Sequence, residues 1–259
     1  MSAAGSAHKP DLAAVRRFEA AGFRAWPAAS VHYDGTWVIR LTANNPAKRL
    51  NSVNPLDPND TVDLEGRIQR AARRFEAHGR RLTFRLSPLS GTVLERHFNQ
   101  QSWNRFSESI VMRLPLDRAA VEGAVDHIPL KDIGRFTDAA AKVHGFDPEL
   151  QQGLSELISR IQPEVGLFVL EANSEPVATA ICVHDKDLAG FFEIATEAGQ
   201  RSKGHARRLV LSALKWARSR GARLAWLQVE ADNEPACSLY TSLGFGEVYR
   251  YHYRQPPET

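Results

Sequence analysis

The feature that most constrains the fold of this 259-residue chain is an internal repeat. Gly79 and Gly221 lie 142 positions apart, and they open the similar segments Gly-Arg-Arg-Leu-Thr-Phe and Gly-Ala-Arg-Leu-Ala-Trp. A run of apolar residues at helical spacing precedes each glycine, which suits the end of a helix. The register therefore predicts two copies of one α/β unit. At this offset, Ile68, Ala72, Phe75, Phe98 and Trp103 align with Val210, Leu214, Ala217, Tyr240 and Phe245.

We place the two units at 11–116 and 125–256, joined by 116–129. The joining segment is not rich in Gly and Ser, so the units are expected to pack together. The pattern of the first unit predicts strands at 35–41, 50–53 and 105–111 and a helix around 68–75. In the second unit it predicts helices at 131–144, 148–161, 203–220 and 235–243, and strands at 167–172, 177–184, 188–196, 224–230 and 247–254.

Composition indicates an ordinary globular protein, because 43% of the residues are apolar and 24% are charged. The 33 basic and 30 acidic residues give a net charge of +3, which does not favour a nucleic-acid binder but suits an anionic cofactor. We interpret the arginine runs at 67–74 and 80–81 as solvated helix faces.

Two cysteines, Cys182 and Cys237, are the basis for any disulfide or metal prediction. No CxxC motif or Cys/His cluster exists, so no metal site is predicted. A disulfide between them is possible, but two small apolar residues in a reducing compartment are favoured. Met1–Pro10 lacks the apolar stretch of a signal peptide, and no run of about 18 apolar residues exists. These features predict a cytoplasmic protein without a membrane span.

The segment from Glu193 to Leu209 carries the clearest chemical signal. An apolar strand runs into a polar, glycine-containing loop and then into an amphipathic helix. The backbone N–H groups of such a loop and of the first helical turn have no internal partner, and the helix dipole favours negative charge there. Gly204 and Ala206 leave room for a phosphate, while Arg201 and Lys203 add positive charge. The segment therefore predicts a pyrophosphate site.

The motif Arg201-Ser202-Lys203-Gly204-His205-Ala206 resembles the Q/R-x-x-G-x-G/A signature of the GCN5-related N-acetyltransferase (GNAT) superfamily. The later segment from Asn233 through Tyr240 to Leu243-Gly244-Phe245 resembles the second signature of that family. The resemblance covers most of 125–256, and the repeat resembles a tandem-GNAT arrangement. It implies an α/β fold of two units, each a mixed and mostly antiparallel sheet flanked by helices, with splayed central strands in the C-terminal unit.

The resemblance also implies acetyl-coenzyme A as the cofactor. The strand residues Ile194, Ala195 and Thr196 would pair with its pantetheine arm. Its pyrophosphate would be held by Arg201, Ser202, Lys203, Gly204, His205 and Ala206. Asn233 would contact the cofactor arm, and Tyr240 would protonate the departing thiolate. Glu193 would take the proton of the acceptor ammonium.

Each of these roles has a structural alternative. Tyr240 could only pack on the preceding strand, Asn233 could only cap a helix, and Glu193 could be an exposed strand residue or an ion-pair partner. Glu230 is a competing base. His144, His184 and His205 are isolated in sequence, and no Ser/His/Asp spacing supports a nucleophilic triad.

The first unit lacks the cofactor signature. Asn59, Val62 and Leu64 stand at the positions of Arg201, Gly204 and Ala206, and Phe98 replaces the tyrosine. We therefore expect a degenerate copy that shapes or covers the acceptor cleft. Its polar and aromatic residues could line an acceptor pocket, although a structural role in core and turn is favoured; they are Trp37, Arg40, Asn51, Ser52, Val53 and Asn54.

The resulting functional hypothesis is an acetyl-CoA-dependent N-acetyltransferase whose acceptor amine attacks the thioester directly. The expected partner is a small-molecule or peptide amine, with no nucleic acid or membrane. The alternative is a regulatory GNAT-like protein that binds acetyl-CoA without turnover. The sequence does not identify the acceptor or the oligomeric state.

Overall fold

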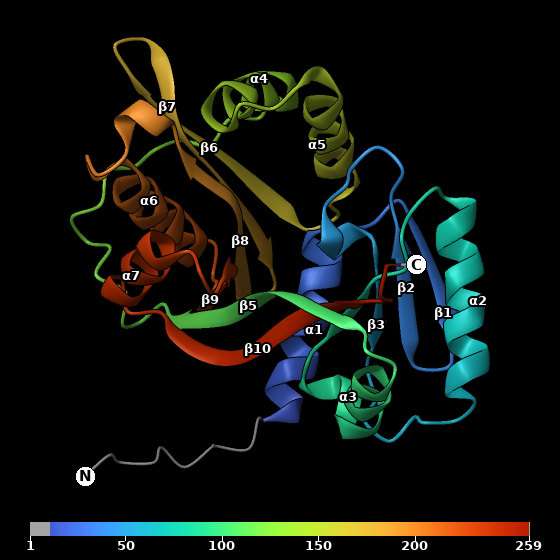
Figure 1. Cartoon of the computed structure of the whole chain (residues 1–259). Coiled ribbons are helices and arrows are strands. Elements are labelled where there is room, and N and C mark those ends of the chain that lie inside the picture. Colours follow the sequence, from blue (N-terminus) through green and yellow to red (C-terminus); the bar gives the residue numbers. More distant parts are fainter. Residues whose placement is uncertain (1–10, 259) are drawn as a thin grey trace.

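The computed structural model describes residues 11–258, so the prediction for Met1–Pro10 lies outside the described residues. Within this range the chain forms one ten-stranded sheet covered by helices (Figure 1). The helices are α1 (Leu12–Ala25), α2 (Leu64–Ala77), α3 (Gly91–Gln100), α4 (Ile133–His144), α5 (Pro148–Arg160), α6 (His205–Ser219) and α7 (Glu234–Ser242). The strands are β1 (Ser30–Asp34), β2 (Trp37–Leu41), β3 (Ser52–Pro55), β4 (Phe84–Leu86), β5 (Asn104–Pro115), β6 (Glu164–Ala172), β7 (Glu175–Asp185), β8 (Leu188–Thr196), β9 (Leu224–Glu230) and β10 (Gly246–Gln255). Short 3-10 turns occupy Lys48–Leu50, Pro88–Ser90 and Ala198–Gln200.

The two repeats are joined by an exchange of their last strands. The strand order is β1-β2-β3-β4-β10-β5-β9-β8-β7-β6. Strand β5 of the first repeat therefore pairs with β9 of the second, and β10 of the second pairs with β4 of the first. Because β5 and β10 also pair with each other, the sheet is continuous. The units pack together as expected, but the boundaries 11–116 and 125–256 stay a prediction.

Backbone hydrogen bonds reproduce the repeat register of 142 positions. Gly79 N–H donates to Glu76 O (2.9 Å), and Gly221 N–H donates to Arg218 O (3.0 Å). Likewise, Trp103 N–H donates to Phe98 O (2.9 Å), and its counterpart bond joins Phe245 N–H to Tyr240 O (3.0 Å). Both glycines have positive φ, as a glycine after a helix allows. The local folding of both repeats therefore follows the same pattern.

The central strands β8 and β9 separate partway along their length. They pair in parallel from Leu188 with Leu224 to Phe191 with Leu227, yet β8 continues to Thr196 and β9 to Glu230. A register shift on the other edge of β8 marks a bulge, where Glu193 adopts a φ of 47°. The splayed central strands implied by the resemblance are therefore present, and the backbone edge of β8 beyond Phe191 lacks a partner on the β9 side.

Helices on both faces supply the core. Helix α6 buries its apolar face on the sheet through residues such as Leu209, Val210 and Leu214. Helices α1, α4 and α5 pack on the opposite face with a second cluster that includes Phe136 and Trp226. Each fully buried side chain of this size stabilises the fold by about 1.5–3 kcal/mol. We call the gap where β8 and β9 separate the wedge. Helices on both faces of the sheet thus pack against the strands that form it.

Three predictions about the first repeat need correction. The expected strand at 50–53 is a 3-10 turn followed by β3 at Ser52–Pro55, and α1, β1 and α3 were not predicted. Arg67 does not lie on a solvated face: it is 4% exposed and its guanidinium pairs with Asp34 and Asp60. Arg80 is not a solvated side chain either, because its guanidinium donates hydrogen bonds to the backbone carbonyls of residues 42, 43 and 45.

A buried ion pair attaches α1 to the sheet. Arg85 of β4 donates from Nη2 to Glu19 Oε1 at 3.0 Å, and both side chains are at most 5% exposed. The Tyr249 hydroxyl of β10 donates to the same carboxylate oxygen at 2.6 Å. The Glu19 carboxylate thus accepts hydrogen bonds from both repeats, from Arg85 in the first and Tyr249 in the second.

We predict that Glu19→Ala lowers the free energy of unfolding by about 3–5 kcal/mol, because it leaves the buried Arg85 guanidinium without a counter-charge. Urea unfolding measures the loss. Glu156→Ala, which removes an exposed pair with Arg160, is the control and should change stability by no more than about 0.5 kcal/mol. Similar losses of unfolding free energy in the two variants would contradict the proposed contribution of the buried pair to stability.

Candidate functional site

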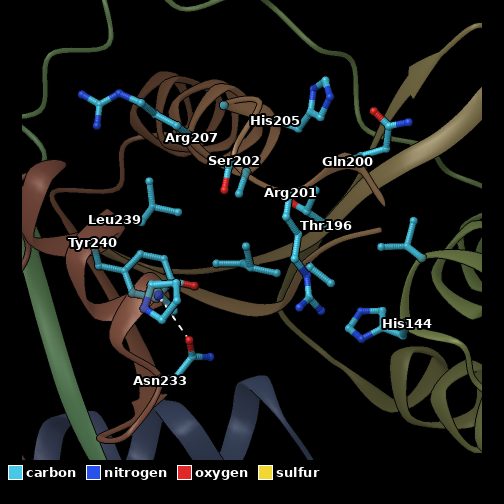
Figure 2. Close-up of a pocket in the computed structure, with 17 residues that line it drawn as sticks. His144, Thr196, Gln200, Arg201, Ser202, His205, Arg207, Asn233, Leu239 and Tyr240 are labelled. Carbon is cyan, nitrogen blue, oxygen red and sulfur yellow. Dashed lines mark hydrogen bonds between the residues drawn. The ribbon is translucent and has the colours of Figure 1, made fainter. Parts of the chain in front are cut away.

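A cavity of about 620 Å³ opens where β8 ends and where α6 and α7 begin (Figure 2). It brings together most of the residues singled out in the sequence. The predicted residues that line it are Ile194, Ala195, Thr196, Arg201, Ser202, Gly204, His205, Ala206, Asn233 and Tyr240. Lys203 and Glu193 are not among its lining residues. The starts of α6 and α7, which are far apart in sequence, therefore form one cavity with the unpaired end of β8.

The loop before α6 is shaped to receive an anion. Ser202 and Gly204 both have positive φ, and α6 begins at His205 without a side-chain cap or an acidic residue in its first turn. The first N–H groups of the helix consequently have no intrahelical acceptor, and the positive end of the helix dipole lies at the cavity. A Cβ built on Gly204 meets nothing within 4 Å, so the approach to this backbone is open.

The charged side chains around the loop have different roles. In Figure 2 the Arg201 side chain extends across the cavity toward His144. Lys203 instead donates to Gln200 Oε1 at 2.9 Å. Arg207 and Gln200 also line the cavity, although the sequence analysis did not select them; Arg207 donates to Ser242 Oγ of α7 at 2.9 Å. The positive charge at the cavity therefore comes from Arg201 and Arg207 rather than from Lys203.

Tyr240 lies on the cavity wall at the end of the wedge. It belongs to α7, its side chain is 6% exposed, and burial raises its pKa to about 12. The phenol is thus protonated near neutral pH and is available as a hydrogen-bond or proton donor. Its position in the cavity goes beyond packing on the neighbouring strand.

Asn233 uses one end of its side chain to cap α7. Its Oδ1 accepts a hydrogen bond from Ala236 N–H at 3.2 Å. Among the described residues, no hydrogen bond is formed by the Nδ2 group of Asn233, which lines the cavity. The cap therefore leaves Nδ2 unused, so capping of α7 does not exclude the cofactor contact that the sequence set against it as an alternative.

Glu193 faces the site from the bulge of β8. Its carboxylate lies 3.7 Å from His144 Nε2, and both side chains are 18% exposed. Although His144 is isolated in sequence, the end of α4 brings it to this carboxylate, and its ring stacks on Phe146. No motif near His144 or Glu193 in the sequence predicts the contact between them. The competing carboxylate of Glu230 is 59% exposed and lies 3.6 Å from Lys48 Nζ.

Two further cavities meet at Glu193. One, of about 240 Å³, lies in the wedge between β8 and β9 and shares His144, Asn233 and Tyr240 with the first cavity. The other, of about 410 Å³, lies beyond Glu193 and is walled by Trp26 and residues 45–48 of the first repeat and by Phe146, Leu150 and Leu154. Residues 45–48 were not predicted to line a site, because no motif near them in the sequence indicates ligand binding.

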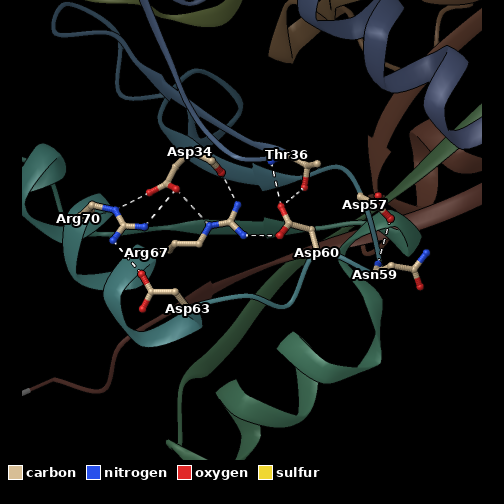
Figure 3. Close-up of polar contacts among 8 residues, drawn as sticks. All are labelled: Asp34, Thr36, Asp57, Asn59, Asp60, Asp63, Arg67 and Arg70. Atoms are coloured by element: carbon tan, nitrogen blue, oxygen red, sulfur yellow. Dashed lines mark hydrogen bonds and ion pairs between the residues drawn. The ribbon is translucent and has the colours of Figure 1, made fainter.

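The corresponding loop of the first repeat is filled by its own carboxylates (Figure 3). Asp60 accepts from Thr36 N–H (3.0 Å) and pairs with Arg67 (2.9 Å). Asp63 lies against the first turn of α2, where its oxygens are 2.5 Å from a Cβ built on Gly66. These carboxylates, paired with Arg67 and Arg70, occupy the region where a phosphate would sit, which fits the expectation of a degenerate copy.

The polar and aromatic cluster of the first repeat is structural. Trp37 is 1% exposed in the core. Asn51 donates to the carbonyls of Asn45 and Ala47, and Asn54 donates to the carbonyls of Val38 and Ser52. These side chains shape the backbone around the site without reaching the 620 Å³ cavity.

Neither cysteine is suited to act as a nucleophile. Cys182 and Cys237 are both free thiols, and burial raises the pKa of each. Within residues 11–258, no three His, Cys, Asp or Glu side chains are arranged to hold a metal ion. No helix in the same range combines the length and apolarity needed to cross a bilayer.

Comparisons with known proteins agree with this geometry. The uncharacterized N-acetyltransferase YobR of Bacillus subtilis is 25% identical over 254 residues, spanning 93% of this chain and 98% of the relative. A GCN5-related N-acetyltransferase from Kribbella flavida superposes with a TM-score of 0.72 at 17% identity, covering 96% of this chain and 97% of that chain. A tandem GNAT protein from the clavulanic acid biosynthesis pathway superposes with a TM-score of 0.60 at 14% identity, covering 93% and 88%.

The match to a protein family is equally extensive. The profile of the family described as "Probable histone acetyltransferase Rv0428c C-terminal" covers residues 12–254. The match includes both repeats, so it is not confined to the cofactor signature. The chain therefore belongs to this family and is an acyltransferase of the GNAT superfamily.

Proposed function

We propose that the protein transfers an acetyl group from acetyl-CoA to a primary amine, which attacks the thioester directly. The observation that carries this proposal is the cavity of about 620 Å³ at the unpaired end of β8, which joins the anion-binding start of α6 to Tyr240. When bound, acetyl-CoA supplies the activated acetyl group. The loop at 201–206 and the start of α6 would hold its pyrophosphate, with Arg201 and Arg207 adding charge.

The unpaired edge of β8 would hold the pantetheine arm. Backbone groups of Ile194–Thr196 lack a partner strand on the β9 side, so an extended chain can add to this edge as a strand would. An N–H on this edge would polarise the thioester carbonyl, because a fixed donor stabilises developing negative charge. The Nδ2 group of Asn233 would complete the contacts to the arm.

Proton transfers would be divided between the two ends of the wedge. On the acceptor side, Glu193 would take the proton from the attacking ammonium, directly or through His144, which lies 3.7 Å away. On the cofactor side, the Tyr240 hydroxyl would donate to the sulfur as negative charge develops on it and would protonate the departing thiolate. Because the pKa of the buried phenol, about 12, exceeds the ordinary thiol pKa of about 8.5, the phenolate is the stronger base and would regain a proton from solvent. Neither step requires a covalent acyl-enzyme.

The first repeat would form the acceptor side of the site. Trp26 and residues 45–48 wall the cavity that meets the wedge at Glu193, while no phosphate-binding loop remains in this repeat. The degenerate copy would thus bind the acceptor and leave the cofactor to the second copy. Free-thiol release from acetyl-CoA with an amine panel tests the activity. Tight cofactor binding without acceptor-dependent release would favour a non-catalytic protein instead.

We predict that Gly204→Glu weakens coenzyme A binding by about 100-fold, or about 2.7 kcal/mol, because a carboxylate would face the pyrophosphate. Isothermal calorimetry measures the change. Gly221→Glu is a matched control: it lies after the other end of α6, has positive φ and has nothing within 4 Å of its Cβ position. Both variants carry the same backbone strain, so an equal loss in affinity would refute the placement of the pyrophosphate.

We predict that Tyr240→Phe lowers kcat by about 100-fold while the dissociation constant of coenzyme A changes by no more than about twofold. Because the phenol pKa is raised to about 12, Tyr240 remains protonated and causes no loss of rate between about pH 6 and about pH 10. Steady-state kinetics and calorimetry measure both effects. Tyr33→Phe, at an exposed position on β1, is the control. An unchanged kcat would remove Tyr240 from the mechanism.

We predict that Glu193→Gln lowers kcat/KM at neutral pH by about 100-fold, because the acceptor then loses its proton only to water. The loss should shrink toward about pH 10, where an alkyl amine itself becomes deprotonated. The comparison is Glu230→Gln, which removes the more exposed competing carboxylate. A pH–rate profile in which Glu230→Gln shows the larger, pH-dependent loss would transfer the role of base to Glu230.

A further inference from the structure

An arginine of the first repeat lines the wedge without a carboxylate partner. Arg49 borders the 240 Å³ cavity together with His144, Glu193 and Glu230. Its guanidinium lies 5.7 Å from the ring centre of Trp26 and 5.9 Å from that of Phe192. Among residues 11–258, its side chain forms no ion pair and donates no hydrogen bond to another side chain or carbonyl. Trp26 and Phe192 stack on each other with their ring centres 4.8 Å apart, so the guanidinium lies beside this stacked pair. A guanidinium next to aromatic rings in a cavity, without an ion-pair partner, is available to a ligand.

The charges beneath Arg49 add to its positive potential. Arg40 and Arg85 lie around the same small hollow as Arg49, with Glu19 as the carboxylate among its lining residues. Arg40 is 4% exposed and donates to the backbone carbonyls of Arg49 and Trp26. Burial, and next the charge of Arg85, lower the pKa of Arg40 to about 9. Three guanidinium groups thus face one carboxylate in this region.

The same 240 Å³ cavity is also lined by acidic side chains. Glu193 and Glu230 line it, and the only cation that an ion pair places on them, apart from His144, is Lys48 on Glu230, within the described part of the chain. The cavity therefore presents charges of both signs, with carboxylates at Glu193 and Glu230 and a guanidinium at Arg49. A ligand with charges of both signs matches this arrangement better than one with a single charge.

The backbone that carries Arg49 is braced before any ligand arrives. Asn51 Nδ2 donates to Asn45 O at 2.7 Å and to Ala47 O at 3.1 Å. Arg80 also donates to the carbonyls of this loop, and the neighbouring Leu50 is fully buried. Little loop ordering is therefore needed on binding, which favours affinity.

Resting on the proposed function, we infer that the acceptor is an amine that also carries a carboxylate, and that Arg49 binds the carboxylate. The planar guanidinium accommodates a carboxylate through two parallel N–H···O bonds. With its carboxylate on Arg49, such a ligand directs its amine toward Glu193 and the thioester end of the wedge. Arg49 is thus a specificity-determining residue that the otherwise degenerate repeat contributes to the site.

Equilibrium binding of product-like acids tests the inference without requiring turnover. The probes are the N-acetyl derivatives of glycine, leucine, phenylalanine and glutamate, each paired with its α-carboxamide and measured by calorimetry with and without coenzyme A. We expect at least one acid to bind about tenfold more tightly than its amide, equivalent to about 1.4 kcal/mol. Arg49→Gln should abolish this preference, and Arg49→Lys should retain part of it because the charge remains without the fork.

Arg16→Gln is the matched control, because it removes the same charge from an exposed position on α1 and should leave the preference intact. Circular dichroism and thermal melting verify that the variants fold. If Arg49→Gln does not fold, the acid and amide comparison on the unaltered protein and on Arg49→Lys still decides the question.

Three outcomes would overturn the inference: equal affinity within every pair, tighter binding of the amides, or no acid binding at about 10 mM. Retention of the full acid preference in Arg49→Gln would overturn the role of Arg49. Failure of the proposed function would look different: coenzyme A would not bind in the same calorimeter, or acetyl-CoA would bind without acceptor-dependent release of the free thiol. A lysine-rich peptide amide that binds more tightly than every acid would likewise count against a carboxylate-bearing acceptor.

Discussion

The site depends on the separation of β8 from β9 beyond Phe191 and Leu227. Parallel strands that stayed paired would consume the backbone groups along this edge and close the wedge. Because they separate, the edge is available to an extended ligand and two cavities meet around Tyr240. The bulge at Glu193 is part of the same distortion, and it directs a carboxylate toward the point where the strands part.

The two repeats contribute different parts of the candidate site. The second repeat keeps an uncapped helix start with open backbone at Gly204, whereas the first covers the equivalent helix start with Asp60 and Asp63. The first repeat nevertheless contributes residues 45–49 to the cavities around Glu193. The acceptor role proposed for the first repeat rests on these residues, and on Arg49 in particular.

The sequence predicted what depends on neighbouring residues and missed what depends on distant ones. The loop at 201–206 and Tyr240 belong to continuous strand, loop and helix patterns, so their places in the cavity could be anticipated. His144 and Arg49 come from other elements and reach Glu193 only through packing of α4 and the first repeat. The exchange of β5 and β10 was also invisible, because either strand has the pattern needed for either place in the sheet.

That exchange explains why a repeat without its own cofactor loop is not dispensable. Strand β5 lies between β10 and β9, so a chain shortened to the second repeat would expose one edge of β9 and lose the partner that aligns it. The first repeat alone would likewise lack β10 beside β4 and offer an open edge to aggregation. Each half is therefore an incomplete sheet in isolation, and the exchanged strands make the sheet of either repeat depend on the other.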